Sequence, residues 1–136
     1  MLYQIDVDYG LQNELICQSK IENCLNQKLN KLDYYNDFDF TNDNNNLLIE
    51  LKSRRCKITD YSDTMISISK INKAKKLIKN KDKKIEIYFF FYYLQNDLYY
   101  WKFDDNIILR IDDNCNYRGI RKKYAYIDTK LLTKIN

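Results

Sequence analysis

A short apolar stretch that contains two charges constrains the fold of this chain more than any other feature. It runs from Leu47 to Arg54 and reads Leu-Leu-Ile-Glu-Leu-Lys-Ser-Arg. Its apolar residues predict a buried strand, and because side chains in a strand alternate between faces, Glu50 and Lys52 point the same way. An acid and an amine on one face of a core strand are costly to bury unless they are paired or bound to something. The stretch therefore predicts a core strand that carries a site.

A second acidic segment lies just upstream of this strand. Residues 34–40 predict a strand in which Asp37 and Asp39 share one face, and residues 41–46 predict a turn that leads back to Glu50. Either aspartate could then join Glu50 and Lys52. Carboxylates beside a lysine at a hairpin can hold a hard divalent metal next to a phosphate. The alternative is that the aspartates are ordinary edge-strand or turn acids.

Helical periodicity predicts a helix before and a helix after these strands. Leucine and isoleucine recur at steps of three and four residues over 11–32, after an extended lead-in. Glu14 falls at the edge of that apolar stripe, so it either faces the acidic strand or is a first-turn acid that favours the helix dipole. A second helix is expected to begin between residues 62 and 69 and to end near 80. Lys70 borders its stripe and either reaches the site or snorkels away.

The second half of the chain predicts several strands. Residues 84–94 are β-branched and aromatic on both faces, which indicates a central strand, and residues 98–103 return after a turn. Residues 107–111 and 124–127 predict further short strands, with a loop over 112–119 between them. Aromatic residues at this density are typical of a core, although they could also stack on bases. The element order predicts an α/β (α+β) fold with a mixed central sheet flanked by helices.

The length and the charge distribution limit the possible functions. At 136 residues, the chain predicts a single domain over 1–136. The net charge is +4, but eight lysines lie between Lys70 and Lys84, and four aspartates lie between Asp33 and Asn46. A basic surface beside an acidic pocket suits a phosphodiester substrate with a metal. A solvated charged helix next to a polar loop is the alternative.

Missing residue types exclude other classes of site. The chain has no histidine, which excludes histidine acid–base chemistry, serine triads and nucleases with histidine-bound metals. Its four cysteines form no C-x-x-C pair, which argues against structural zinc, and Cys17 and Cys24 are expected in the core rather than in a disulfide. We see no signal peptide and no apolar run of membrane-spanning length. We expect an intracellular protein of the cytoplasm or nucleus that is not secreted and not bound to a membrane.

Taken together, these residues resemble the PD-(D/E)XK nuclease superfamily. The resemblance rests on Asp39, on the run Ile49-Glu50-Leu51-Lys52 that places Glu50 eleven residues later, and on the helix with Lys70. It covers residues 11–94, and the wider pattern looks like small nuclease-like proteins of large DNA viruses and phages. No proline precedes the aspartate, which leaves Asp37 as the alternative to Asp39.

The resemblance implies a restriction-endonuclease-like core of order αβββαβ with extra C-terminal strands. It implies that Asp39, Glu50 and the main-chain carbonyl of Leu51 bind Mg²⁺ or Mn²⁺. Lys52 would orient the attacking water, and Lys70 would contact the phosphate. Glu14 would orient a metal-bound water or complete a second metal site. The residues expected to follow the DNA backbone are Arg54, Arg55, Lys57, Lys73, Arg118, Arg121, Lys122 and Lys123.

Three functions are compatible with these features. The first is a metal-dependent deoxyribonuclease that acts as an endonuclease on DNA. The second is a nucleic-acid-binding module on the same fold that has lost catalysis. The third is a small α/β interaction protein in which Glu50 and Lys52 form a structural pair. A nuclease core of this size can act as a homodimer, and the aromatic strands over 84–103 could supply the interface.

Overall fold

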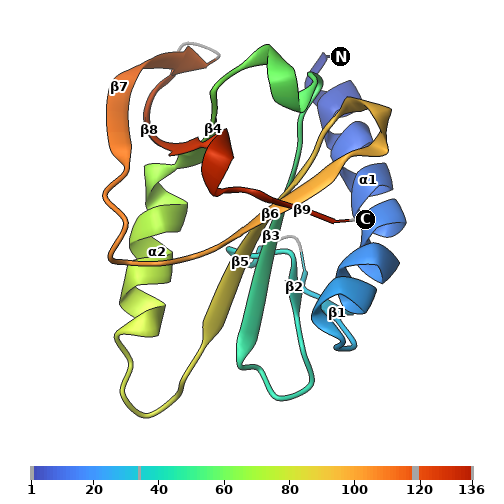
Figure 1. Cartoon of the computed structure of the whole chain (residues 1–136), viewed down its shortest axis with the longest axis vertical. Helices are drawn as coiled ribbons and strands as arrows, with labels where there is room; N and C mark the ends of the chain where they lie inside the picture. Colours follow the sequence, from blue (N-terminus) through green and yellow to red (C-terminus); the bar gives the residue numbers. More distant parts are fainter. Residues whose placement is uncertain (1, 34, 118–119, 136) are drawn as a thin grey trace.

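In the part of the chain that the structure describes, two β-sheets and two α-helices make up the framework of the fold (Figure 1). The computed structural model describes residues 2–33, 35–117 and 120–135, and it describes the side chains of residues 8–33, 35–112 and 122–135. Within this part of the chain, a six-stranded sheet has the order β1-β2-β3-β5-β6-β9. Its strands are β1 (Asn30–Lys31), β2 (Phe40–Thr41), β3 (Leu47–Ser53), β5 (Glu86–Tyr92), β6 (Leu98–Lys102) and β9 (Thr133–Lys134).

The pair β3 and β5 forms the middle of this sheet. These two strands run parallel with Glu50 opposite Phe89 and Lys52 opposite Phe91, whereas all other neighbouring strands in the sheet are antiparallel. A parallel pair needs a crossover connection, and β4 (Asp63–Ser67) with α2 (Ile68–Ile78) provides it. The prediction of a central strand within residues 84–94 is confirmed.

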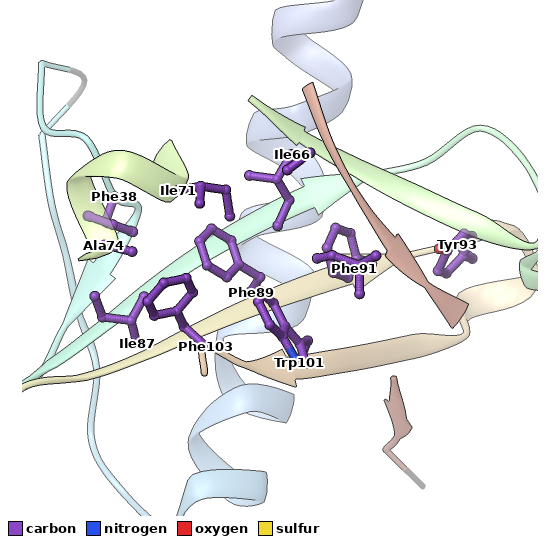
Figure 2. Close-up of a cluster of buried hydrophobic side chains, with 12 residues drawn as sticks. Phe38, Ile66, Ile71, Ala74, Ile87, Phe89, Phe91, Tyr93, Trp101 and Phe103 are labelled. Carbon is purple, nitrogen blue, oxygen red and sulfur yellow. The ribbon is translucent and has the colours of Figure 1, made fainter. Parts of the chain in front are cut away.

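The helices cover opposite faces of the sheet (Figure 1). Helix α1 (Leu2–Leu25) contributes Cys17 and Ile21 to a core with Ile49 and Phe90. Helix α2 contributes Ile71 and Ala74 to a second core, which is built mainly on the aromatic residues of β5 and β6. Figure 2 shows Phe89, Phe91, Trp101 and Phe103 of this second core below Ile66 and Ile71.

A smaller sheet packs over the same face as α2. It has the order β4-β8-β7, with β7 (Arg110–Tyr117) and β8 (Ile120–Asp128). Ile66, Ala125 and Ile127 bring its apolar face into the α2 core. Strand β7 corrects an expectation, because residues 112–117 continue the strand instead of forming a loop. They pair with β8, with a register shift between Asp112 and Cys115, and backbone pairing outweighs their polar side chains.

The first helix begins and ends earlier than the sequence pattern predicts. Residues 2–9 are helical rather than an extended lead-in, and the helix stops at Leu25 instead of near residue 32. Asn26 follows with φ 53°, a left-handed conformation that commonly ends helices. Leu29 lies in the loop after the helix, and its side chain is buried in the core. Its apolar character therefore reflects core packing and not a continuation of the helix.

The predicted strand over 34–40 is also wrong for most of its length. Only Phe40 and Thr41 pair with β3. Just before them the chain turns, because the Asp33 carboxylate accepts hydrogen bonds from the backbone N–H of Tyr35 at 3.1 Å and from the Asn36 side chain at 2.8 Å. Such local hydrogen bonds compete with a strand. Asp37 and Asp39 therefore do not share the face of one strand.

Other expectations concern surfaces. Neither helix among the described residues has the length and apolar composition that crossing a bilayer requires. Cys17 is a buried free thiol as expected, while Cys24 is also free but exposed. The aromatic residues of 84–103 pack largely inside the chain's own cores, so a homodimer stays a prediction. Among the side chains of the first helix that the structure describes, the large apolar residues Leu11, Leu15 and Ile16 are exposed.

Candidate active site

The site lies just before Phe40, the first residue of β2, where β3 continues beyond β2 along that edge. The backbone N–H of Asp39 donates to the carbonyl of Ile49 at 2.8 Å, which extends the pairing by one residue beyond β2. Farther along β3, the N–H of Leu51 donates its hydrogen bond to a side chain and not to a backbone carbonyl. The acceptor is the Oδ2 of Asp39, at 2.7 Å. This bond holds the Asp39 carboxylate against the Glu50-Leu51-Lys52 segment.

The main-chain carbonyl of Leu51 lies on this same edge. In a strand the N–H and C=O of one residue point to the same side, and alternate residues share that side. The Ile49 carbonyl and the Leu51 N–H both face Asp39. The Leu51 carbonyl therefore points to the edge that carries the Asp39 carboxylate, beyond Phe40, the first residue of β2.

Glu50 is buried on the face of the sheet that α2 covers. Only 3% of the residue is exposed. The Nζ of Lys70, from the first turn of α2, lies 3.0 Å from its Oε2 and 5.4 Å from the centroid of the Phe38 ring. The position of Lys70 agrees with the expectation that this lysine reaches back to the sheet. Its ammonium compensates part of the cost of burying the Glu50 carboxylate.

Glu14 approaches the same edge from α1. Because α1 begins at Leu2, Glu14 lies inside the helix and is not a first-turn acid. Its Oε2 is 2.6 Å from the Nζ of Lys31. Burial raises the pKa of the Glu14 carboxyl; the nearby Lys31 ammonium opposes this rise, and the charge of Asp39 adds to it. Glu14 is thus a partly buried acid directed at Asp39.

Asp39 lies between the other two carboxylates. Burial, together with the charge and hydrogen bonding of Glu50, raises its pKa to about 7, although the Leu51 N–H and Glu14 act in the opposite direction. The buried Oε2 atoms of Glu14 and Glu50 have no hydrogen-bond partner among the described residues, although each has a lysine ammonium nearby. Such a row of carboxyl groups is stabilised by a cation bound between them.

The donor atoms fit a hard divalent metal with a small set of protein ligands. Among the described residues, no group of three or more histidine, cysteine, aspartate or glutamate side chains is arranged to hold a metal ion by itself. Mg²⁺ often takes only one or two carboxylates and keeps several water ligands. Asp39, Glu50 and the Leu51 carbonyl form an all-oxygen set of that size, and the Glu50 oxygen that faces the Lys70 ammonium belongs to it.

Two cavities of about 590 and 480 Å³ meet at this cluster. Glu14, Asp39, Glu50 and Lys52 line both of them. The face on which Lys52 lies is that of Glu50, as the strand alternation predicted. Lys52 forms no ion pair with any side chain that the structure describes. A ligand phosphate in either cavity would meet this ammonium.

The structure separates Asp37 from the cluster. The Asp37 side chain is 59% exposed and lies 3.6 Å from the Nζ of Lys73, on the outer side of α2. It lines neither cavity of the cluster. Lys73 was expected to contact DNA, and in the structure it forms an ion pair with Asp37, away from Glu50.

The other basic residues are divided between the cavity walls and the surface. Arg54 and Arg55 line the 590 Å³ cavity together with Lys122. The Arg54 guanidinium donates to Oγ1 of Thr64 at 3.1 Å and to the carbonyl of Met65, so it is part of the wall. Arg55 lies over the Tyr9 ring, 4.5 Å from its centroid. Lys57 lines a neighbouring cavity, and Lys123 is exposed. Arg118 and the side chain of Arg121 lie outside the described residues.

Sequence reasoning missed the residues that hold the site in place. Asn13 is buried, and its Nδ2 donates to the Oγ of Ser53 at 2.9 Å, which ties α1 to the end of β3. Lys31 pairs with Glu14 from the edge strand β1. A polar residue next to Glu14 on the apolar stripe was a signal for Asn13, but nothing local marks Lys31.

Comparison with known proteins adds one finding. The family whose model matches residues 3–121 is described as "Phage putative PDDEXK endonuclease". The match covers most of the chain, including every residue of the carboxylate cluster. No curated protein and no solved structure matches the chain.

Proposed function

Because the chain belongs to the phage PD-(D/E)XK endonuclease family, we propose that it is a divalent-metal-dependent deoxyribonuclease that hydrolyses DNA phosphodiester bonds at Asp39, Glu50 and Lys52. The position of the Asp39 carboxylate is the strongest support for this proposal. The Asp39 carboxylate is fixed to the Leu51 N–H beside buried Glu50, at the edge of a cleft that Lys52 also lines.

We assign the metal to a defined set of oxygen atoms. The Asp39 and Glu50 carboxylates and the Leu51 carbonyl would hold Mg²⁺ or Mn²⁺. When bound, the metal supplies Lewis-acid polarisation of the scissile phosphate and a bound water of lowered pKa. Asp39 must lose its proton to act as a ligand, and because its pKa is raised to about 7, protons compete with the metal at and below neutral pH.

The lysines have separate roles in this proposal. Lys52 positions the attacking water and stabilises the negative charge that develops on the phosphate oxygens. Lys70 balances Glu50 in the free protein and contacts the substrate phosphate, since it lines the 480 Å³ cavity. Glu14 orients a water in the cleft, and Lys31 keeps its carboxylate in place.

The DNA backbone would follow the basic mouth of the cleft. Arg55 and Lys122 line the cleft and are assigned to phosphate contacts, as is Lys57 on the adjoining wall. Lys123 follows Lys122 in β8, where successive side chains point to opposite faces, so it receives no contact here. Such contacts release counterions, so binding should weaken steeply with salt. Arg54 is assigned a positioning role, because its donors already serve Thr64 and Met65.

An inactive nucleic-acid-binding module is the second candidate. The observation that favours it is the Lys70–Glu50 ion pair, which already gives the buried carboxylate a cation. The two candidates differ in a simple way, because only the nuclease needs Lys52 next to an ionised Asp39.

The direct test is cleavage of plasmid, single-stranded and four-way-junction DNA with Mg²⁺, Mn²⁺ or EDTA. The proposal expects metal-dependent cutting by the wild type and loss of cutting in Lys52→Ala. The matched control is Lys130→Ala, which removes an exposed lysine that lines none of the cavities described here, and it should cut normally. Salt-sensitive DNA binding without cutting would move the assignment to the inactive module.

A further inference from the structure

A third cavity shares a wall with the catalytic cleft. It has a volume of about 340 Å³, and its lining includes Arg54, Tyr61, Thr64, Met65, Tyr93 and Tyr126. Arg54 and Met65 also line the 590 Å³ cleft that contains Asp39, Glu50 and Lys52. A molecule held in the cleft is thus separated from this cavity only by the wall that these two residues form.

The lining has the character of a ligand pocket. Ligand pockets of this size class are mostly apolar and aromatic, with a few polar groups that fix orientation. Here three tyrosine rings supply aromatic surface, and Arg54, Lys57, Asp63 and Thr64 supply the polar and charged groups.

Tyr93 is the most unusual group of the pocket. Only 4% of the residue is exposed, and its hydroxyl has no hydrogen-bond partner among the described residues. Burial raises the pKa of the phenol, while neighbouring Thr64 and Arg54 lower it, so the hydroxyl lies near two other residues of the lining. A buried donor without an acceptor is costly, and a ligand that offers an acceptor would recover this cost.

Arg54 makes the shared wall rigid. Its guanidinium is tied to Thr64 and Met65 of β4, and it lies 5.6 Å from the centroid of the Phe91 ring. A fixed positive charge between the two cavities suits a ligand whose phosphate lies on one side and whose aromatic part lies on the other.

From this arrangement we propose that the cavity receives an unpaired nucleobase of the DNA strand whose backbone lies in the cleft. The inference rests on the proposed nuclease function and narrows its substrate class. Stacking of bases on aromatic side chains tolerates any base, because every base has a π face. A base inside a duplex cannot enter such a pocket without leaving its stack. The preferred substrates are therefore bulged, branched or single-stranded DNA rather than continuous duplex.

The test compares binding of three DNA probes in EDTA, where no cutting interferes. The first is a duplex with one unpaired adenine, the second carries an abasic residue at that position, and the third is fully paired. We expect the wild type to bind the first probe about tenfold more tightly than the second, which corresponds to ~1.4 kcal/mol.

Two variants of the pocket and one control separate the base contact from general loss of binding. Tyr61→Ala removes a tyrosine that is 67% exposed, so the fold should tolerate it, and it should abolish most of the tenfold preference. Tyr93→Phe should reduce the preference about threefold without lowering the melting temperature, because its hydroxyl has no partner to lose. Tyr35→Ala removes a 93% exposed tyrosine outside the pocket and should leave the preference intact.

The outcomes separate this inference from the nuclease proposal. Equal affinity for the unpaired and abasic probes, or a Tyr61→Ala loss that is the same for all three probes, would overturn the base pocket. Metal-dependent cutting could still be intact in that case. A lower melting temperature of Tyr93→Phe would also contradict the inference, since the hydroxyl would then be structural. Absence of DNA binding together with absence of cutting would overturn both proposals.

Discussion

The neighbouring strands β3 and β5 lie in the same layer but use it differently. On the face toward α2, β5 presents Phe89 and Phe91, and β3 presents Glu50 and Lys52 directly opposite them. Phe89 is fully buried and Glu50 is 3% exposed, so both strands withdraw their side chains from water to a similar degree. One strand gains packing from this burial, and the other bears the cost of a buried charge. The difference indicates that β5 stabilises the sheet and β3 carries its chemistry.

The largest effect on stability should come from removing an aromatic ring from the core side of β5. Phe89→Ala removes a ring that packs against Phe38, Trp101 and Phe103. We expect a loss of about 3–5 kcal/mol in the free energy of unfolding, because a cavity is left in the core. Chemical denaturation measures it. A loss below about 1 kcal/mol would contradict the view that β5 stabilises the sheet.

The next effect is the pH dependence of stability that arises from the carboxylate cluster beside β3. The pKa of Asp39 in the folded protein is raised to about 7, above the ordinary 3.8 of the unfolded chain. The folded state therefore binds its proton more tightly, so this contribution to stability is complete below pH 4 and is lost as the pH rises to 7. Melting curves of the metal-free protein should show the decline.

The Asp39→Asn variant and added metal test whether Asp39 causes this pH dependence. The variant should flatten the pH dependence, because it removes the titrating group. Mg²⁺ should raise the melting temperature more at pH 8 than at pH 5.5, since it binds the ionised carboxylates. A metal effect that is equal at both pH values, or stronger at the lower one, would argue against Asp39 as a ligand.

A smaller effect is expected when the buried charges are replaced together by apolar groups. The double variant Glu50→Leu, Lys70→Met removes both members of the ion pair, and such replacements are often neutral or stabilising by about 1–4 kcal/mol. Glu50→Ala alone, which leaves Lys70 unpaired beside a cavity, should destabilise the protein. Thermal unfolding of both variants distinguishes the cases. If the double variant were as unstable as the single one, the pair would be structural.

The smallest effect is expected at an exposed pair of the same sheet. Lys102 on β6 lies 3.2 Å from the carboxylate of Glu86 on β5, and both side chains are well exposed. Solvent screens such pairs, so Lys102→Ala should change the free energy of unfolding by at most about 0.5 kcal/mol. A change above about 1 kcal/mol would contradict the view that solvent exposure makes the Lys102–Glu86 pair weaker than the buried Lys70–Glu50 pair.

The sequence was sufficient to predict the parts of the fold and site that follow from local pattern. Strand alternation predicted that Glu50 and Lys52 share a face, and aromatic residues on both faces predicted that β5 is central. The position of Lys70 at the border of the apolar stripe left two alternatives, reaching the site or snorkelling away, and in the structure Lys70 reaches Glu50. Each of these features depends on a single period along one element.

The features that pattern could not predict depend on contacts between distant segments. Asp37 and Asp39 are alike in sequence, and only the turn made by Asp33 separates them. The end of α1 could not be read from spacing, because Leu29 keeps the helical period while it packs from a loop. The aromatic pocket joins residues of β4, β8 and the segment after β3, whose proximity arises only in the folded chain.

The most direct test of the account exploits this pair of aspartates. Asp39→Asn and Asp37→Asn make the same chemical change two residues apart, one inside the carboxylate cluster and one on the surface. In single-turnover cleavage of junction DNA with Mg²⁺, we expect Asp39→Asn to lose roughly 100-fold or more in rate. Asp37→Asn should change the rate by less than about threefold, as expected for an exposed residue whose ion pair with Lys73 is screened. Normal cutting by Asp39→Asn, or loss of cutting only in Asp37→Asn, would contradict the site described here.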